Sequence, residues 1–186
     1  MKKIITILLI LFTLTTFGQD KELFDFINQY RVVNNRKSLK WSDKLVKISI
    51  GQNNKNIKTN SLSHSTYNSY ENCLRGYGVA NTLVKEKEFH NFTKKYFKYT
   101  YIVGDNLNKG QLNTLTKMYM IYIWHTSPGH RKNMLRNNVN FCSAESSIGD
   151  DYKFVNGVFK FGDKTYKYKT VSSHYEILYY ATMNIK

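Results

Sequence analysis

The hydrophobic pattern of the chain changes once, near Asn138, and this change limits the fold more than any other feature. Before it, apolar residues recur at helical spacing; after it, short runs rich in β-branched and aromatic residues continue to Ile185. Helices first and strands last are typical of an α+β domain whose antiparallel sheet covers the helices. Since no repeat or long linker divides the chain, we expect a single domain over residues 20–186.

Four helices are predicted before the change. In the first, Leu23, Phe26, Ile27 and Tyr30 share one face, and Ser42 is a good N-cap for the second. The predicted segments run from Leu23 to the polar stretch 34–38, from Ser42 to about Lys58, from Lys85 to about Tyr101 and from about Lys109 to His125.

Two further segments carry local signals. Residues 59–81 are rich in Ser, Asn, Tyr and Gly without a sustained period, which predicts an ordered loop region. Among the later runs, Asn156-Gly157 stands between two alternating segments and predicts a hairpin turn.

The N-terminus indicates export. Lys2 and Lys3 precede the uncharged run Ile4–Phe17, and small Gly18 follows, as in a secretory signal peptide over residues 1–19. The alternative, a membrane anchor, is disfavoured because this run of about fourteen residues is shorter than the about 20 that a bilayer requires. We therefore expect a secreted protein, extracellular or periplasmic, that does not span the membrane.

The charge balance indicates which partners to expect. The chain has 28 Lys and Arg, of which residues 1–19 hold two, and 13 Asp and Glu, so residues 20–186 carry a formal charge of +13. Such a surface attracts polyanions such as anionic lipid headgroups or acidic glycans, although the same lysines can serve solubility alone. Nucleic acid is not expected as a partner, because export removes the usual target and no binding motif is present.

Two cysteines, Cys73 and Cys142, occur in a chain that is expected to reach an oxidising compartment. One disulfide between them is the direct inference. The alternative is two free thiols, with Cys73 as a nucleophile activated by His64 or His130.

The segment Trp124–Leu135, "WHTSPGHRKNML", contains the only proline of the chain. Ser127 is placed to cap a new helix, and Pro128 fits its first position, where no N–H is needed. His130 then falls in the first turn, where the helix dipole favours neutral imidazole, a form that can bind a metal or accept a proton. The alternative is a histidine that only packs and hydrogen-bonds.

Together with other segments, this one resembles bacterial members of the CAP superfamily, which includes cysteine-rich secretory proteins, antigen 5 and plant pathogenesis-related proteins. The matching segments occur in the family's order from Leu23 to Ile185. They are "INQYR", "LKWSDKL", "LSHS" around His64, "ENC" around Glu71, "WHTSPGHRKNML" and "YYATMNI".

The resemblance implies a three-layer α-β-α sandwich with a central antiparallel sheet, the CAP/SCP fold, and a cleft where histidines and glutamates meet. His64 matches the first histidine, Glu71 the motif glutamate and His130 the second histidine; Tyr70 and Trp124 are expected beside them. Ser127 stands where the family has a second glutamate.

Two imidazoles and a carboxylate form a set that can hold Zn²⁺ or another divalent cation with one position open. The resemblance implies a secreted binding module for sterols, fatty acids or glycans, and the basic charge adds anionic lipid or acidic glycan as expected partners. Two alternatives use the same residues: a metal-assisted hydrolase of peptide or ester bonds, with Glu71 as its catalytic group, and a polar network that only holds loops to the sheet.

Overall fold

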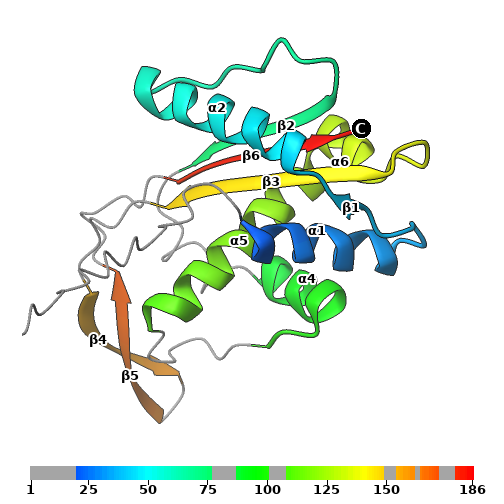
Figure 1. The fold of residues 1–186 in the computed structure, drawn as a ribbon. Helices are drawn as coiled ribbons and strands as arrows, with labels where there is room; N and C mark the ends of the chain where they lie inside the picture. Colours follow the sequence, from blue (N-terminus) through cyan, green and yellow to red (C-terminus); the bar gives the residue numbers. More distant parts are fainter. Residues whose placement is uncertain (1–19, 77–86, 101–107, 149–153, 162–163, 172–178) are drawn as a thin grey trace, which may run out of the picture.

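Helices cover both faces of a four-stranded sheet (Figure 1). The computed structural model describes residues 20–76, 87–100, 108–148, 154–161, 164–171 and 179–186. The expected signal peptide over residues 1–19 lies outside this part of the chain. One helix, α2, lies over one face of the sheet, and α1, α4 and α5 lie on the other, so the α+β class is confirmed.

The four predicted helices are present, and α6 follows them. Their bounds are α1 Lys21–Val33, α2 Asp43–Thr59, α4 Lys87–Phe97, α5 Lys109–Thr126 and α6 Pro128–Met134. Ser42 caps α2 as predicted, its side chain accepting a hydrogen bond from the Leu45 N–H. Pro128 opens α6, but the Ser127 side chain makes no capping hydrogen bond. Among the described helices, none has the length and apolar character needed to cross a membrane.

The sheet is mixed, which corrects the expectation of a purely antiparallel one. Its order is β1 (Lys40–Trp41), β3 (Phe141–Ile148), β6 (Tyr179–Ile185) and β2 (Tyr70–Gly76). The last three are antiparallel neighbours, but β1 pairs with β3 in parallel. The parallel neighbour is thus the two-residue edge strand β1, and the rest of the sheet is antiparallel.

Strand β2 corrects the prediction that residues 59–81 form a loop region. It pairs with β6 along its whole length, from Tyr70 opposite Ile185 to Gly76 opposite Tyr179. Its sequence "YENCLRG" has no alternation of apolar and polar residues, the usual local sign of a strand. Pairing with β6, more than one hundred residues away in sequence, therefore determines this strand.

A hairpin is present in this region, but it is not the predicted one, because the runs on either side of Asn156-Gly157 belong to a single strand. Strand β4 (Phe154–Phe161) continues through Asn156 and Gly157, and it pairs in antiparallel fashion with β5 (Lys164–Val171). The last pair of the ladder is Phe161 opposite Lys164, so the strands are joined beyond Phe161. The two residues between them in sequence, Gly-Asp, are themselves a hairpin signal.

The hydrophobic core lies on the face of the sheet that α1, α4 and α5 cover. Along β6, Ala181, Met183 and Ile185 point into this core and are at most 1% exposed. The helices contribute aromatic and long aliphatic side chains, including Leu23, Ile27, Tyr30, Phe89, Phe92, Leu115, Met120, Ile121 and Trp124. Burial of this apolar surface is the main driving force for folding on this side.

The opposite face of the sheet, under α2, is polar. Thr182 and Asn184 alternate with the core residues of β6 and are fully buried, as are Ser49 and Asn53 of α2. Hydrogen bonds join the two layers: Ser49 Oγ lies 2.7 Å from Ser143 Oγ, and Asn184 Nδ2 donates to Ser49 Oγ over 3.0 Å. The candidate site lies in this polar layer.

A buried arginine fixes the position of α6. Arg31 of α1 is 1% exposed and donates hydrogen bonds to the backbone carbonyls of Lys37, Met134 and Arg136. Hydrogen bonds from a charged donor contribute about 1.5–3 kcal/mol each. The C-terminal end of the helix that carries His130 is therefore held against α1.

Candidate functional site

Two side chains of β2 bring ligating atoms into the polar layer. Glu71 and Cys73 are two positions apart on one strand, so both point to the same face. Glu71 lies opposite Asn184, and Cys73 lies opposite Thr182, the two buried polar residues of β6. The face is therefore the one that α2 covers.

The loop after α2 brings His64 to these two residues. Ser63 is held by α2: its carbonyl accepts from Gln52 Nε2 over 2.6 Å and from Asn56 Nδ2 over 3.2 Å, and its N–H donates to Asn56 Oδ1 over 3.0 Å. Gln52 and Asn56 are buried polar residues on the sheet side of α2. The polar face of α2 thus sets where the next residue, His64, lies.

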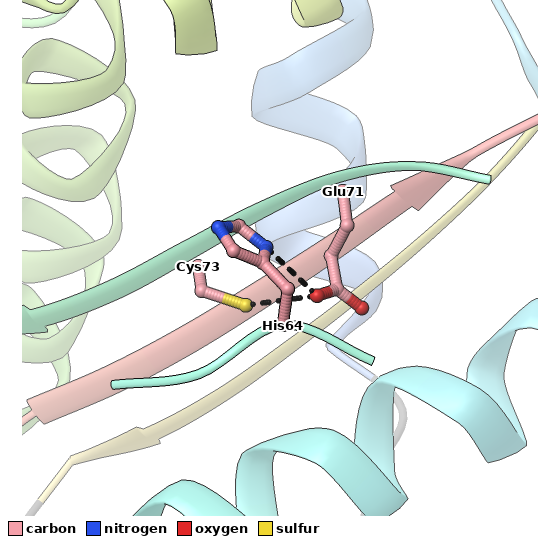
Figure 2. A group of neighbouring side chains, drawn as sticks. All are labelled: His64, Glu71 and Cys73. Carbon is pink, nitrogen blue, oxygen red and sulfur yellow. Dashed lines mark hydrogen bonds and ion pairs between the residues drawn. The ribbon is translucent and has the colours of Figure 1, made fainter. Parts of the chain in front are cut away.

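The three side chains meet at one carboxylate oxygen (Figure 2). His64 Nδ1 lies 3.0 Å from Glu71 Oε1, Cys73 Sγ donates to the same oxygen over 3.2 Å, and the Ser65 N–H donates to it over 2.8 Å. The other oxygen, Oε2, is buried and has no hydrogen-bond partner among the described residues. The carboxylate is thus well satisfied on one side and has acceptor capacity left on the other.

Burial and hydrogen bonding oppose each other in setting the charge of Glu71. Burial raises the pKa of this carboxyl, but hydrogen bonds from Ser65, Cys73 and His64 outweigh it and hold the pKa below its usual range. Glu71 is therefore an anion at neutral pH. Its side chain is only 5% exposed, whereas that of His64 is 60% exposed.

The thiol of Cys73 is in the opposite situation. Burial and the neighbouring negative charge of Glu71 raise the pKa of Cys73 to about 12. Because the thiolate is the nucleophilic form, this environment argues against the cysteine nucleophile considered from the sequence.

The predicted disulfide is absent, which corrects the inference from the export signal. Both cysteines are free and buried. Cys73 lies in β2 and Cys142 in β3, on either side of β6, so about two strand spacings of roughly 4.8 Å separate the strands. This exceeds the about 7 Å limit for Cα atoms that a disulfide can join.

His130 lies in the first turn of α6, as predicted, and α6 packs against β2. Asn72 Nδ2 donates to the His130 carbonyl over 3.0 Å, and Asn133 Nδ2 donates to Asn72 Oδ1 over 3.0 Å. Burial, and then the nearby charge of His64, lower the pKa of His130. The neutral form that the sequence predicts is thus favoured.

The imidazole of His130 stands outside the tightest cluster. Among the described residues, the group whose ligand atoms all lie within 4.8 Å of one another consists of His64, Glu71 and Cys73. His130 Nδ1 is buried and has no hydrogen-bond partner in the described chain. The structure therefore brings His64 and Glu71 together, places His130 near them and adds Cys73, a residue for which the sequence predicts a disulfide.

Two expected neighbours of the cleft lie elsewhere. Trp124 is fully buried in the hydrophobic core, on the far side of the sheet from Glu71. Tyr70 precedes Glu71 on the strand and so points to the opposite face; the residue is 37% exposed, and its ring packs under the Arg136 guanidinium, 3.4 Å from the ring centre. Neither side chain joins the cluster.

The cluster has the donors that a metal site requires. An imidazole, a carboxylate and a thiol are all zinc ligands, and three protein ligands leave one coordination position open. The unpartnered Glu71 Oε2 fits this use, since a buried anionic oxygen without a hydrogen bond is a costly group to leave alone. A spacing of Glu-x-Cys on a strand was the sequence signal that could have revealed Cys73.

Comparisons with known proteins give a likeness to a solved structure. No family model matches the sequence, and no curated protein matches it. Among solved structures, the fold is similar to an outer surface protein from Borrelia burgdorferi, with a TM-score of 0.40 and 14% sequence identity. The match covers 88% of this chain and 89% of that one.

Proposed function

We propose that this protein is an exported, CAP-like binding module with a divalent-cation site built on His64 and Glu71. The observation that carries the proposal is the asymmetric environment of the Glu71 carboxylate. One oxygen accepts three hydrogen bonds, and the other is buried without a partner among the described residues. A bound cation at Oε2 would satisfy the remaining charge.

Two features support the CAP assignment. Helices lie on both faces of the sheet, as in an α-β-α sandwich (Figure 1). Residues from three separate segments, which carry His64, Glu71 and His130, come to one edge of the sheet at β2. These are the three residues that the family resemblance assigns to one cleft.

Binding is favoured over hydrolysis because the chain departs from the family at the position of the second glutamate. With Glu71 engaged as a ligand, a metal hydrolase needs another acid or base near the metal. The family's second glutamate would be that group, and Ser127 occupies its position. We therefore expect the site to bind rather than to turn over peptide or ester substrates.

The outer surface of α2 supports an anionic partner. Lys44, Lys47, Lys55 and Lys58 are all exposed. At 3.6 residues per turn, these positions fall within about 80° around the helix axis and extend over about 21 Å. The helix contains a single acid, Asp43. We name these four residues the α2 lysine stripe and propose that it contacts acidic glycan or anionic lipid headgroups at a cell surface.

A calorimetric zinc titration at neutral pH tests the metal site. We expect one saturable site in the wild-type protein, lost in His64→Ala and retained in His90→Ala. His90 is a matched control because it belongs to α4, on the other side of the sheet. If the wild-type protein binds no zinc, the three residues form only a polar network and the proposal fails.

A further inference from the structure

Cys73 has no role in the cleft that the family resemblance implies, and it forms no disulfide. Its side chain nevertheless points at the Glu71 carboxylate from the same face of the same strand (Figure 2). The residue is 1% exposed, so surface chemistry does not account for it. The position of the thiol within the cluster requires a separate explanation.

We propose that Cys73 Sγ is a metal ligand, which together with His64 and Glu71 makes this a site for zinc or a similar borderline transition-metal ion. This inference rests on the proposed function and extends it, since it names the third ligand and the class of metal. Cys73 then takes the third position that the family resemblance gives to His130, whose imidazole lies outside the cluster.

The spacing of the three groups suits tetrahedral coordination. Zinc bonds of about 2.0–2.3 Å place tetrahedral ligand atoms about 3.3–3.8 Å apart. Glu71 Oε1 lies 3.0 Å from His64 Nδ1 and 3.2 Å from Cys73 Sγ, and the three ligand atoms all lie within 4.8 Å of one another. Small side-chain rotations are therefore enough to open the cluster around an ion.

A second observation concerns the other oxygen of the same carboxylate. The Glu71 side chain is only 5% exposed, and its Oε2 lacks a partner among the described residues. Most buried carboxylate oxygens in proteins are paired. The 60% exposed imidazole of His64 leaves one side of the cluster open to solvent, which provides an entry path and a free coordination position.

The ligand set determines the class of metal. Calcium and magnesium prefer oxygen ligands only, whereas imidazole with thiolate selects zinc, cobalt and related ions. On binding, the S–H bond of Cys73 breaks, a metal–sulfur bond forms and the proton passes to the buffer. The hydrogen bond from Sγ to Glu71 Oε1 is replaced by coordination, and no electron transfer is involved.

A cobalt titration followed by visible and near-ultraviolet absorption tests the inference. The reduced wild-type protein should bind one Co²⁺ and show a sulfur-to-cobalt charge-transfer band together with intense tetrahedral ligand-field bands. Cys73→Ala should lose the charge-transfer band and weaken zinc binding by more than about 100-fold, since groups that merely orient ligands already contribute 10- to 100-fold. Cys142→Ala is the matched control, a buried cysteine of the opposite face, and should keep the band.

The outcomes separate this inference from the proposed function. If the wild-type protein binds cobalt without a charge-transfer band, or if Cys73→Ala keeps that band, Cys73 is not a ligand although the metal site stands. If neither the wild-type protein nor any variant binds cobalt or zinc, both proposals fail. Should Cys73→Ala not fold, zinc X-ray absorption of the wild-type protein decides: one sulfur at about 2.3 Å supports the inference, and a shell of nitrogen and oxygen only overturns it.

Discussion

His64 Nδ1 lies 3.0 Å from Glu71 Oε1, and this contact joins an exposed loop to a buried strand. The histidine is supplied by a loop that α2 holds at Ser63, and the carboxylate by β2, which only its pairing with β6 defines. The buried Glu71 carboxylate is thus in contact with an imidazole that is itself exposed to solvent.

The charge of Glu71 should make stability depend on pH. Because hydrogen bonds hold its pKa in the folded protein below the unfolded value near 4.5, the ionised carboxylate stabilises the fold above that value. This stability should be lost as the pH falls from about 4.5 through the lower folded pKa. Glu71→Gln cannot titrate, so the difference in unfolding free energy between wild type and variant should shrink across that window in urea titrations. A difference that stays constant down to pH 2 would contradict the assignment.

Glu145 should have the opposite effect. Burial, and then the negative charge of Asp20, raise the pKa of this carboxyl to about 7, although Lys117 opposes the shift. The folded state then binds a proton that the unfolded state releases near pH 4.5, so stability should fall as the pH rises from about 4.5 to above 7. Glu145→Gln should therefore stabilise the protein at pH 8 by on the order of 2–3 kcal/mol and have little effect at pH 4.

The control for this measurement is Glu88→Gln, a change at an exposed acid of α4. It should alter the unfolding free energy by less than about 0.5 kcal/mol at either pH. Equal effects of Glu145→Gln at pH 4 and pH 8 would show that folding does not raise the pKa of Glu145.

The two cysteines should react only when the protein unfolds. Cys73 and Cys142 are 1% and 0% exposed and form no disulfide. In mass spectra of unreduced protein, we expect no iodoacetamide adduct under native conditions and two adducts in denaturant. Denatured protein that takes up the reagent only after reduction would reveal a disulfide and overturn the strand positions of these residues.

The α2 lysine stripe should carry binding to polyanions. Changing Lys44, Lys47, Lys55 and Lys58 to glutamine should weaken binding to vesicles containing phosphatidylglycerol, and wild-type binding should fall as salt is added, because exposed charges are screened over about 10 Å at 0.1 M. The control is a variant in which four other exposed lysines, from α4 and α6, are changed to glutamine: Lys87, Lys94, Lys95 and Lys132. Equal losses in both variants would mean that net charge, not the stripe, governs binding.

Local patterns were sufficient to predict the helices. The face shared by Leu23, Phe26, Ile27 and Tyr30 is buried in the core, and Ser42 caps α2, because helical period and capping depend on residues within a few positions of one another. The residues His64 and Glu71 were also identified from sequence, through the family resemblance. The turn predicted at Asn156-Gly157 was wrong. These two residues lie inside β4, where pairing with β5 outweighs the local turn signal.

What only the tertiary structure decided concerns the layer between α2 and the sheet. Both surfaces there are polar, so β2 shows no alternation and was assigned to a loop, and Cys73 was paired with Cys142 although β6 separates them. The sequence by itself determined which segments become helices and that strands follow them. Which side chains meet at the site depends on the pairing of β2 with β6, whose residues are more than one hundred positions apart, and packing of the whole chain rather than local period sets that pairing.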